Sequence, residues 1–439
     1  MRDPVLTFLI FGSLPFILMR PWIGVLMWSW LGLMNPHRLS WSYAFSMPFA
    51  QAVAIATLLG MLLSKEKLRI PWSPVVVALA LFVVWLTITT IFAIDRDAAL
   101  VEWEKVMKIQ LMTFVTLMLI TDRKRLQTLV WVVVVSLGFY GIKGGIYTTG
   151  TGGAEHVLGP EGSFISGNTE IGLAMIMVLP LMRALQLNSE RKLIRWGLAV
   201  AMLLTGLAIL GTGSRGAFVG AGAMAVMLWL KSRKKAILLI VLLAAVPLLL
   251  SVMTDSWYQR METIATYEQD SSAMGRIRAW EFSTRMAIAR PLGGGFESYT
   301  PENYLLYAPD LNAINERGLV ADAHSIYFQV LGHHGFVGLA LYLVLLGTAW
   351  KAASGVIRQT RSTPDLKWAH DTAAMAQVSL FGFMVAGAFL GLAYFDLIYT
   401  LIAVIVITRT LIETELNRES AASTGGKALT TKILQPAER

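Results

Sequence analysis

The chain has 439 residues, of which 55% are hydrophobic and only 15% are charged, and its mean hydropathy is +0.59. A soluble globular protein carries about 25% charged residues, so this balance excludes an ordinary soluble domain. Cysteine is absent, which excludes disulfides, thiolate catalysis and thiolate metal sites. The net charge of +9 does not indicate nucleic-acid binding, because Lys and Arg concentrate in short loops between apolar runs, as in membrane proteins.

Apolar runs near the length of a membrane-crossing helix recur along the whole chain. We therefore expect an all-α polytopic membrane protein with about 12 transmembrane helices, the two short N-terminal runs counting as one or two. The first run lacks a small-residue cleavage site, so no cleavable signal peptide is expected. The candidate spans, in chain order, are residues 5–19, 22–35, 48–63, 74–94, 105–120, 126–146, 169–187, 194–212, 216–230, 236–253, 323–350, 374–391 and 395–413.

Basic residues in every second loop give the orientation. They are Lys65, Lys67 and Arg69; Arg123, Lys124 and Arg125; Arg191, Lys192 and Arg195; Lys231, Arg233, Lys234 and Lys235; and Lys351, Arg358, Arg361 and Lys367. The positive-inside rule assigns these loops to the cytoplasm and leaves the N-terminal hairpin ambiguous. The expected division is an N-terminal bundle (1–253), a periplasmic loop (254–322), C-terminal transmembrane helices (323–414) and a disordered cytoplasmic tail (415–439).

The periplasmic loop, residues 254–322, has six arginines, no lysine and ten carboxylates. Residues 272–289 have the pattern of an amphipathic helix that ends at Arg290-Pro291. On this helix Glu281 is spaced to pair with Arg278 and Arg285. Arg276 has no carboxylate among its helical neighbours and stands four residues before Trp280. Such an arginine at a membrane surface is either a lipid-headgroup anchor or a phosphate ligand. A structural role fits Arg290 better, because Pro291 follows it.

A second arginine lies in the short turn Gly213-Ser214-Arg215-Gly216, between two apolar runs. It is either a snorkelling side chain or an anion ligand, since the turn also begins a new helix. Asn168 and Glu170 open the span at 169–187. A carboxylate at that depth needs a wet cavity or a basic partner, and Arg215, Arg276 or Lys143 could neutralise it.

His324 stands at the mouth of the span that begins at residue 323, two residues after Asp322. The carboxylate could orient the imidazole for proton transfer, or it could only cap the helix. His333 and His334 lie deeper and are expected to be buried and neutral, lining a polar cavity. Asp95-Arg96-Asp97 has the form of a metal-binding Asp-x-Asp, but such tripeptides are common by chance, and no metal site is expected.

In this order, these segments resemble the O-antigen ligase/polymerase superfamily of bacterial envelope glycan enzymes. The segments are Asn168, Ser214-Arg215-Gly216, Gly275-Arg276 with Trp280, Arg290-Pro291-Leu292-Gly293-Gly294-Gly295-Phe296, and Ala323-His324-Ser325 with Tyr327-Phe328-Gln329, Gly335 and Gly338. Met34-Asn35-Pro36-His37-Arg38 is similar to a branch described as putative O-glycosylation ligases. Two positions depart from the family pattern: Ser325 stands where Asn often follows the His, and His333 stands where an acidic residue is common.

The resemblance implies an O-antigen ligase that moves a glycan from undecaprenyl diphosphate to lipid A–core at the periplasmic face, without a metal, nucleotide or other cofactor. It implies catalytic roles for Arg215, Arg276 and His324. Further substrate-binding roles are predicted for Asn168, Glu170, Arg278, Trp280, Arg290 and Asp322. The expected partners are the lipid-linked donor, the lipid A–core acceptor and membrane lipids. The same architecture serves glycan polymerases and protein O-oligosaccharyltransferases. A lipid or polysaccharide transporter fits less well, because no internal repeat is visible.

Overall fold

The computed structural model describes residues 2–232, 234–262 and 271–433, and within these ranges all regular secondary structure is helical. The apolar helices are α1 (Arg2–Met19), α2 (Trp22–Met34), α3 (Phe49–Leu63), α4 (Pro74–Ile91), α5 (Arg96–Leu119), α6 (Arg123–Thr151), α7 (Asn168–Asn188), α8 (Lys192–Gly211), α9 (Arg215–Lys231), α10 (Lys235–Leu250), α14 (Ile326–Gln359), α15 (Lys367–Ala386) and α16 (Asp396–Ile433). The shorter helices are α11 (Asp255–Glu262), α12 (Ser271–Ala289) and α13 (Pro301–Tyr307). The 3-10 turns are η1 (Pro36–Leu39), η2 (Tyr43–Phe45), η4 (Pro309–Leu311), η5 (Pro364–Leu366) and η6 (Gly387–Phe389).

Every predicted span corresponds to one of the apolar helices, so the protein is an all-helical, multi-pass membrane protein. Over the described residues, eight helices are long and apolar enough to cross a membrane, or nine if the bent pair of α10 and α11 forms one span. The expected count of about 12 is therefore not confirmed. The difference has physical causes: α5 carries Glu102, Glu104, Lys105 and Lys108, and α2, α3, α9 and α10 have 17 residues or fewer.

Glycine residues on α6 allow it to pack closely against α8. A Cβ on Gly145 would lie 2.2 Å from the carbonyl oxygen of Leu204, and a Cβ on Gly141 would lie 2.2 Å from Oγ1 of Thr205. Small residues are the usual means of close helix approach within a membrane, because lipid supplies no hydrophobic drive for association. The α6–α8 pair thus forms a tightly fitted part of the bundle.

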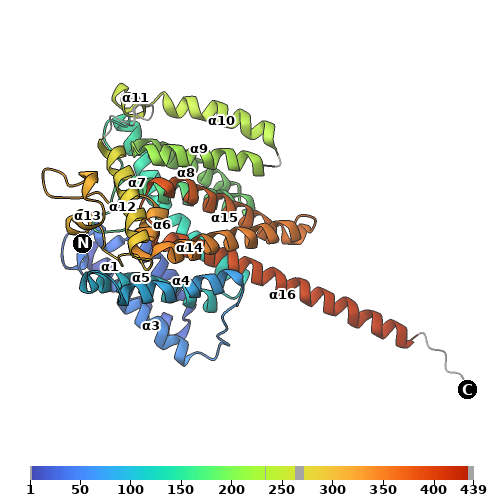
Figure 1. Ribbon diagram of the computed structural model, residues 1–439. Helices are drawn as coiled ribbons and strands as arrows, with labels where there is room; N and C mark the ends of the chain where they lie inside the picture. The colour runs from blue at the N-terminus through green and yellow to red at the C-terminus, as the bar shows by residue number, and fades with distance from the viewer. Residues whose placement is uncertain (1, 233, 263–270, 434–439) are drawn as a thin grey trace, which may run out of the picture.

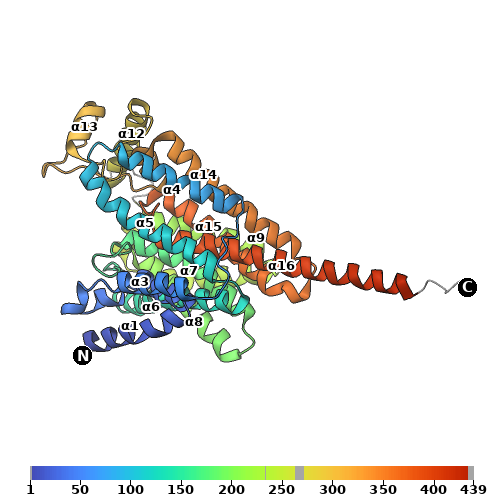
Figure 2. The same cartoon turned by 90° about the horizontal axis from the view of Figure 1, so that it is seen from below.

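The two ends of the bundle differ (Figures 1 and 2). Helices α11, α12 and α13 gather at one end, whereas α16 runs out from the other. The N-terminal hairpin, whose orientation is ambiguous from sequence, places its start at the end that holds α12: the carboxylate of Asp3 accepts a hydrogen bond from Ala44 N at 3.1 Å. The guanidinium of Arg38 in turn lies beside Gly162, in the loop before α7.

Helix α14 is broken at Gly335, which has φ +67° and ψ −171°. The break frees backbone carbonyls, which must find partners inside a membrane protein. The glycine triplet after α12 supplies them: Gly294 N donates to Gly332 O, and Gly295 N donates to His333 O, each at 2.8 Å. The glycine triplet therefore fixes the segment that follows α12 against α14.

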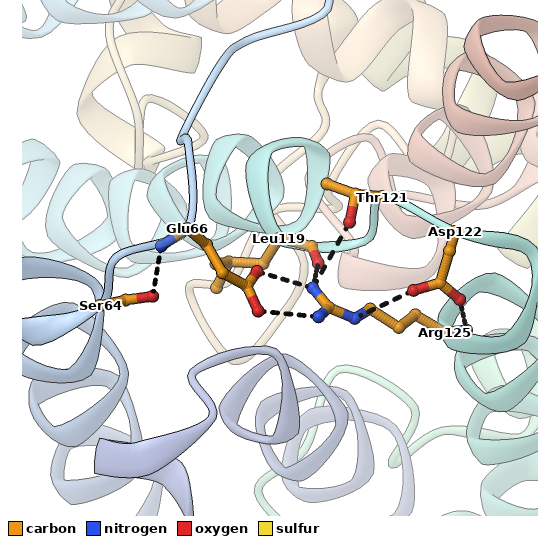
Figure 3. A network of polar contacts seen from close by, with 6 residues as sticks. All are labelled: Ser64, Glu66, Leu119, Thr121, Asp122 and Arg125. Atoms are coloured by element: carbon orange, nitrogen blue, oxygen red, sulfur yellow. Dashed lines mark hydrogen bonds and ion pairs between the residues drawn. The ribbon is translucent and has the colours of Figure 1, made fainter. Parts of the chain in front are cut away.

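At the opposite end, Arg125 connects the α3–α4 linker to the start of α6 (Figure 3). Its two terminal nitrogens each donate to a carboxylate oxygen of Glu66 at 2.8 Å, and Nε lies 3.1 Å from Asp122 Oδ2. The same guanidinium donates to Leu119 O at 2.9 Å. This hydrogen-bonded ion pair lowers the pKa of Glu66. One of the loops predicted to be basic and cytoplasmic is thus organised around a single arginine.

The C-terminal segment differs from its sequence expectation. The structure continues α16 as a helix through Ile433, whereas composition predicts a disordered tail over residues 415–439. The start of this segment contains Glu and Ala residues, which favour helix, so α16 has no strong stop signal at Arg418. Residues 434–439 lie outside the described part of the chain.

Candidate active site

Four segments far apart in the sequence converge at the end of the bundle that holds α12. They are the start of α7, the turn between α8 and α9, helix α12, and the residues just before α14. Each carries at least one of the residues singled out from sequence, and all of these residues lie near a helix terminus or on the helix that covers it. The polar groups therefore collect at one surface of the bundle.

The turn between α8 and α9 is held by specific hydrogen bonds. Gly213 has φ +60°, a left-handed conformation that favours glycine. Ser214 caps α9, its Oγ accepting from Ala217 N at 3.2 Å. Asn168, the first residue of α7, donates from Nδ2 to Thr212 O at 2.8 Å. These contacts place half-buried Arg215 in the first turn of α9. Asn168, which the sequence predicts to bind substrate, thus joins the start of α7 to this turn.

His324 has a constrained backbone. Its φ is +42°, a left-handed conformation that non-glycine residues rarely adopt and that costs free energy unless neighbouring contacts hold it. One such contact is the indole of Trp280, whose Nε1 donates to Ala323 O at 2.7 Å. The same indole stacks on Phe328, with ring centroids 5.1 Å apart and planes 7° from parallel. In the structure Trp280 thus contacts the two sides of the His324 turn.

The electrostatic surroundings of His324 include three of the other predicted site residues. Burial is the largest influence and lowers the pKa of His324, and the positive charge of Arg276 lowers it further. The negative charges of Asp322 and Glu170 act in the opposite direction. With its pKa below the ordinary 6.5, the imidazole is neutral near pH 7 and able to accept a proton.

The 3-10 turn η6 and the residues after it connect the Arg215 turn to His324. A Cβ on Gly216 would lie 3.0 Å from Phe389 Cβ, at the end of η6. Two residues further on, the position of a Cβ on Gly391 is 3.8 Å from His324 Cα. The start of α9 and the start of α14 therefore pack on opposite ends of one short connector between α15 and α16.

The remaining predicted site residues have different surroundings. Arg278 is exposed and makes one long contact, 3.4 Å from Nη1 to Asn312 O. Arg290 donates to two backbone carbonyls, Gly293 O at 3.3 Å and Phe92 O at 3.0 Å, and so connects the end of α12 to the end of α4. Asp322 is exposed beside His324. These positions give Arg290 a structural contact, as its place before Pro291 suggests.

The expected charge ladder on α12 is only partly present. Arg285 pairs with Glu281 at 2.6 Å and also with Asp310, which is itself outside α12. Arg278 makes no ion pair with Glu281 within the described residues. Lys143, considered as a partner for Glu170, is exposed on α6.

Two residues near the site are not among the predicted site residues, although Arg260 is one of the six arginines of the 254–322 loop. Arg260 donates from Nε to Gly213 O at 2.9 Å. The ring of His156 lies against Gly213, 2.6 Å from where a Cβ would be. Burial and the charge of Arg260 lower the pKa of His156. Both residues lie in segments without a motif, and only the packing of α11 and the 152–167 loop brings them to the Arg215 turn.

The other histidines and the Asp-x-Asp have local partners. His334 Nδ1 is 2.6 Å from Thr89 Oγ1, and His333 Nδ1 is 3.2 Å from the hydroxyl of Tyr394. Both histidines are buried, as expected. Asp95 caps α5 by accepting from Ala98 N at 3.0 Å. Within the described ranges, no three His, Asp or Glu side chains are grouped closely enough to hold a metal ion.

The fold and this arrangement define a multi-pass membrane protein with a candidate site of arginine, carboxylate and histidine side chains at one end of its helices. Residues 199–343 match the family model described as O-Antigen ligase, and residues 1–190 match one described as Family of unknown function (DUF5935). The chain thus carries a domain of the O-antigen ligase superfamily, a family of membrane glycosyltransferase-like ligases, and the resemblance seen in the sequence is confirmed. No curated protein matches the chain.

Proposed function

We propose that this protein is an O-antigen ligase of the bacterial inner membrane. It transfers a glycan from undecaprenyl diphosphate to lipid A–core at the periplasmic face, without a metal and with inversion at the anomeric carbon. The observation that carries the proposal is the grouping of Arg276, Glu170 and Asp322 around His324. Arg215, Arg276 and His324 all lie within residues 199–343, the part matched to the O-antigen ligase family.

The arginines supply the electrostatic part of the reaction. When the bond between the anomeric carbon and the phosphate oxygen breaks, the negative charge on the lipid diphosphate grows. Arg215, in the first turn of α9, and Arg276, on α12, stabilise that charge, because a guanidinium can hold two phosphate oxygens at once. The N-terminus of α9 adds a favourable field for an anion. Asn168 supports this arrangement by holding the turn before Arg215.

His324 supplies the general base. Its neutral imidazole takes the proton from the acceptor hydroxyl as that oxygen forms a bond to the anomeric carbon, and the diphosphate leaves with the electron pair of the broken bond. Attack from the face opposite the leaving group inverts the anomeric centre. Glu170 and Asp322 then stabilise the imidazolium that forms, because their charges raise the pKa of His324.

Two other enzyme functions use the same chemistry with a different acceptor. A polymerase would add the glycan to a second lipid-linked glycan, and a protein O-oligosaccharyltransferase would add it to a Ser or Thr hydroxyl. A ligase is favoured over a polymerase because the sequence contains only one large loop on the site face, residues 254–322. A transporter is disfavoured because the charged residues of the candidate site collect at one end of the bundle instead of along its interior.

The test is transfer by the purified protein from an undecaprenyl-diphosphate glycan to lipid A–core in the presence of EDTA, followed by gel mobility. Arg276→Ala and His324→Ala should each lower turnover by about 100-fold or more, as expected for loss of transition-state stabilisation or of a general base. Arg317→Ala, in the same segment but exposed, is the matched control and should retain activity.

Each outcome is informative. Glycan on lipid A–core, lost in the two site variants only, supports a metal-independent ligase. Lengthening of the lipid-linked glycan itself would make the protein a polymerase, and transfer to protein alone would make it an oligosaccharyltransferase. Near-normal turnover of Arg276→Ala would contradict its role as a phosphate ligand.

A further inference from the structure

We propose a second anion site at the end of the bundle opposite His324, where α14 and α16 form a pocket for the phosphate of an anionic phospholipid headgroup. The inference does not depend on the proposed ligase activity. It rests on a cavity, its cationic lining, and its depth along the helices.

The cavity lies between the last turns of α14 and the middle of α16. Its volume is about 210 Å³. The cavity is lined by Lys351, Ala352, Gly355, Val356, Arg358, Gln359 and Arg409. Gly355 opens the space, because a Cβ built there would meet nothing within 4 Å. Lys351, Gly355 and Arg358 are four and three residues apart, so they lie on one face of α14.

The three cations of the lining exceed the negative charge nearby. Glu413 pairs with Arg409 at 2.7 Å. Lys351 and Arg358 are exposed, and neither makes an ion pair within the described residues. One carboxylate among three cations leaves two positive charges uncompensated. The end of α14 does not require them, because Thr360 already caps it, donating from N and Oγ1 to Val356 O.

The depth of the cavity corresponds to the membrane surface. Helix α14 runs antiparallel along α4, with Trp85 Nε1 bonded to His334 O and the ring of Phe82 beside that of Tyr342. At 1.5 Å per residue, Lys351 lies about 14 Å beyond Tyr342, and the start of α4 lies about 12 Å from Phe82 in the same direction. Lys351 is therefore level with the start of α4, where the apolar span begins, and Arg358 lies further out.

The positive charge of the cavity and its position at the membrane surface favour an anionic lipid headgroup as the ligand. Basic pockets between helices at the cytoplasmic membrane surface suit anionic headgroups, and each cation near such a surface adds about 1 kcal/mol of attraction. Arginine also offers paired donors to phosphate oxygens. A free phosphate would meet the same lining, so the lipid and the soluble anion must be separated by experiment.

The experiment uses the full-length protein in nanodiscs made of phosphatidylcholine, with phosphatidylglycerol or cardiolipin added in steps and bound lipid counted by native mass spectrometry after release. The double variant Lys351→Gln/Arg358→Gln should weaken anionic-lipid retention by about 25-fold, at about fivefold for each cation. Arg191→Gln/Lys192→Gln removes the same charge from exposed residues at the start of α8, on the face predicted to be the same. These side chains are not part of the cavity lining, so this variant should lower retention much less than the pocket variant does.

A second variant tests the cavity independently of its charge. Gly355→Leu keeps all three cations and fills the space, so it should also lower retention. Its folding is checked by its elution and melting temperature without anionic lipid. Thermal protection by inorganic phosphate alone, lost in Lys351→Gln/Arg358→Gln, would support the phosphate chemistry and assign it to a soluble anion. Equal lipid retention in the pocket variants and the α8 control would overturn the proposal.

Discussion

The backbone at His324 illustrates how tertiary contacts prepare a single residue. A left-handed φ at a non-glycine position persists only where the surroundings hold it. Here the indole of Trp280 bonds the preceding carbonyl, while Arg276, Asp322 and Glu170 set the charge environment of the ring. Geometry and protonation state at this residue are therefore controlled by different side chains, and each can be tested separately.

Asp322→Asn tests the charge environment. Asp322 raises the pKa of His324, so its neutralisation should lower that pKa further. A base that must be deprotonated loses activity as pH falls through its pKa, so the acid limb of kcat/KM should move to lower pH. The measurement is the pH profile of transfer, with Asp365→Asn at the opposite end of α14 as control. An acid limb that stays in place or moves to higher pH would contradict the assignment of His324.

Trp280→Phe tests the geometry. Phenylalanine keeps an aromatic ring for stacking on Phe328 but loses the donor to Ala323 O. We expect kcat to fall by about tenfold or more while KM changes less, because a small displacement of a catalytic group is costly. Trp72→Phe, at an exposed position, is the control. A fall in melting temperature without a change in kcat would show that the bond stabilises the fold only.

At the scale of elements, the close approach of helices depends on glycine residues, which have no reactive side chain. The α6–α8 contact requires glycine where a Cβ would meet the backbone of Leu204. The broken helix α14 requires the Gly294 and Gly295 amides to satisfy the carbonyls of Gly332 and His333. Both features hold the site-bearing helices in place, one through α8 and its following turn, the other through α12.

Gly145→Ala measures the first of these contacts. The added methyl group would overlap a carbonyl oxygen that cannot move independently, and such overpacking costs about 1–3 kcal/mol. We expect a lower melting temperature in detergent. Gly150→Ala on the same helix is the matched control, because its Cβ would meet nothing within 4 Å and alanine favours helix. Equal melting temperatures for the two variants would contradict the close packing of α6 against α8 at Gly145.

At the scale of the whole molecule, the placement of the two ends decides the proposed function. The alternation of helices places residues 36–45, the α8–α9 turn and α12 at one end, and the Arg125 cluster and Lys351–Arg358 at the other. The proposed periplasmic reaction requires the first end to face outward. The N-terminal hairpin, ambiguous from its charges, shares that end through the contact between Asp3 and Ala44.

The absence of cysteine makes this orientation directly measurable. Single variants Asn315→Cys and Ser42→Cys, both at exposed positions on the site end, should react with a membrane-impermeant maleimide in intact cells whose outer membrane is permeable to it. Ser362→Cys, exposed at the other end, should react only after the inner membrane is opened. Labelling of Ser362→Cys alone in intact cells would invert the orientation and exclude a periplasmic reaction.

The sequence by itself determined the helices, because the length of apolar runs and the positions of Pro, Gly and basic residues are local properties. All 13 candidate runs became helices, and residues 272–289 became α12. Arg276, Glu170, Asp322 and His324 could be selected individually, because a polar group near the end of an apolar run costs free energy unless it has a partner or contacts water. The number of true spans was less accessible, because charge within α5 and the bend after α10 depend on what surrounds them.

Only the tertiary structure decided which of these residues meet. Arg290 and Trp280 bond to the backbone carbonyls of Phe92 and Ala323, and these contacts depend on how α12 packs. Arg260 and His156 carry no motif and reach Gly213 through the packing of separate loops. Long-range pairing of this kind arises from the packing of whole helices, which no local pattern encodes.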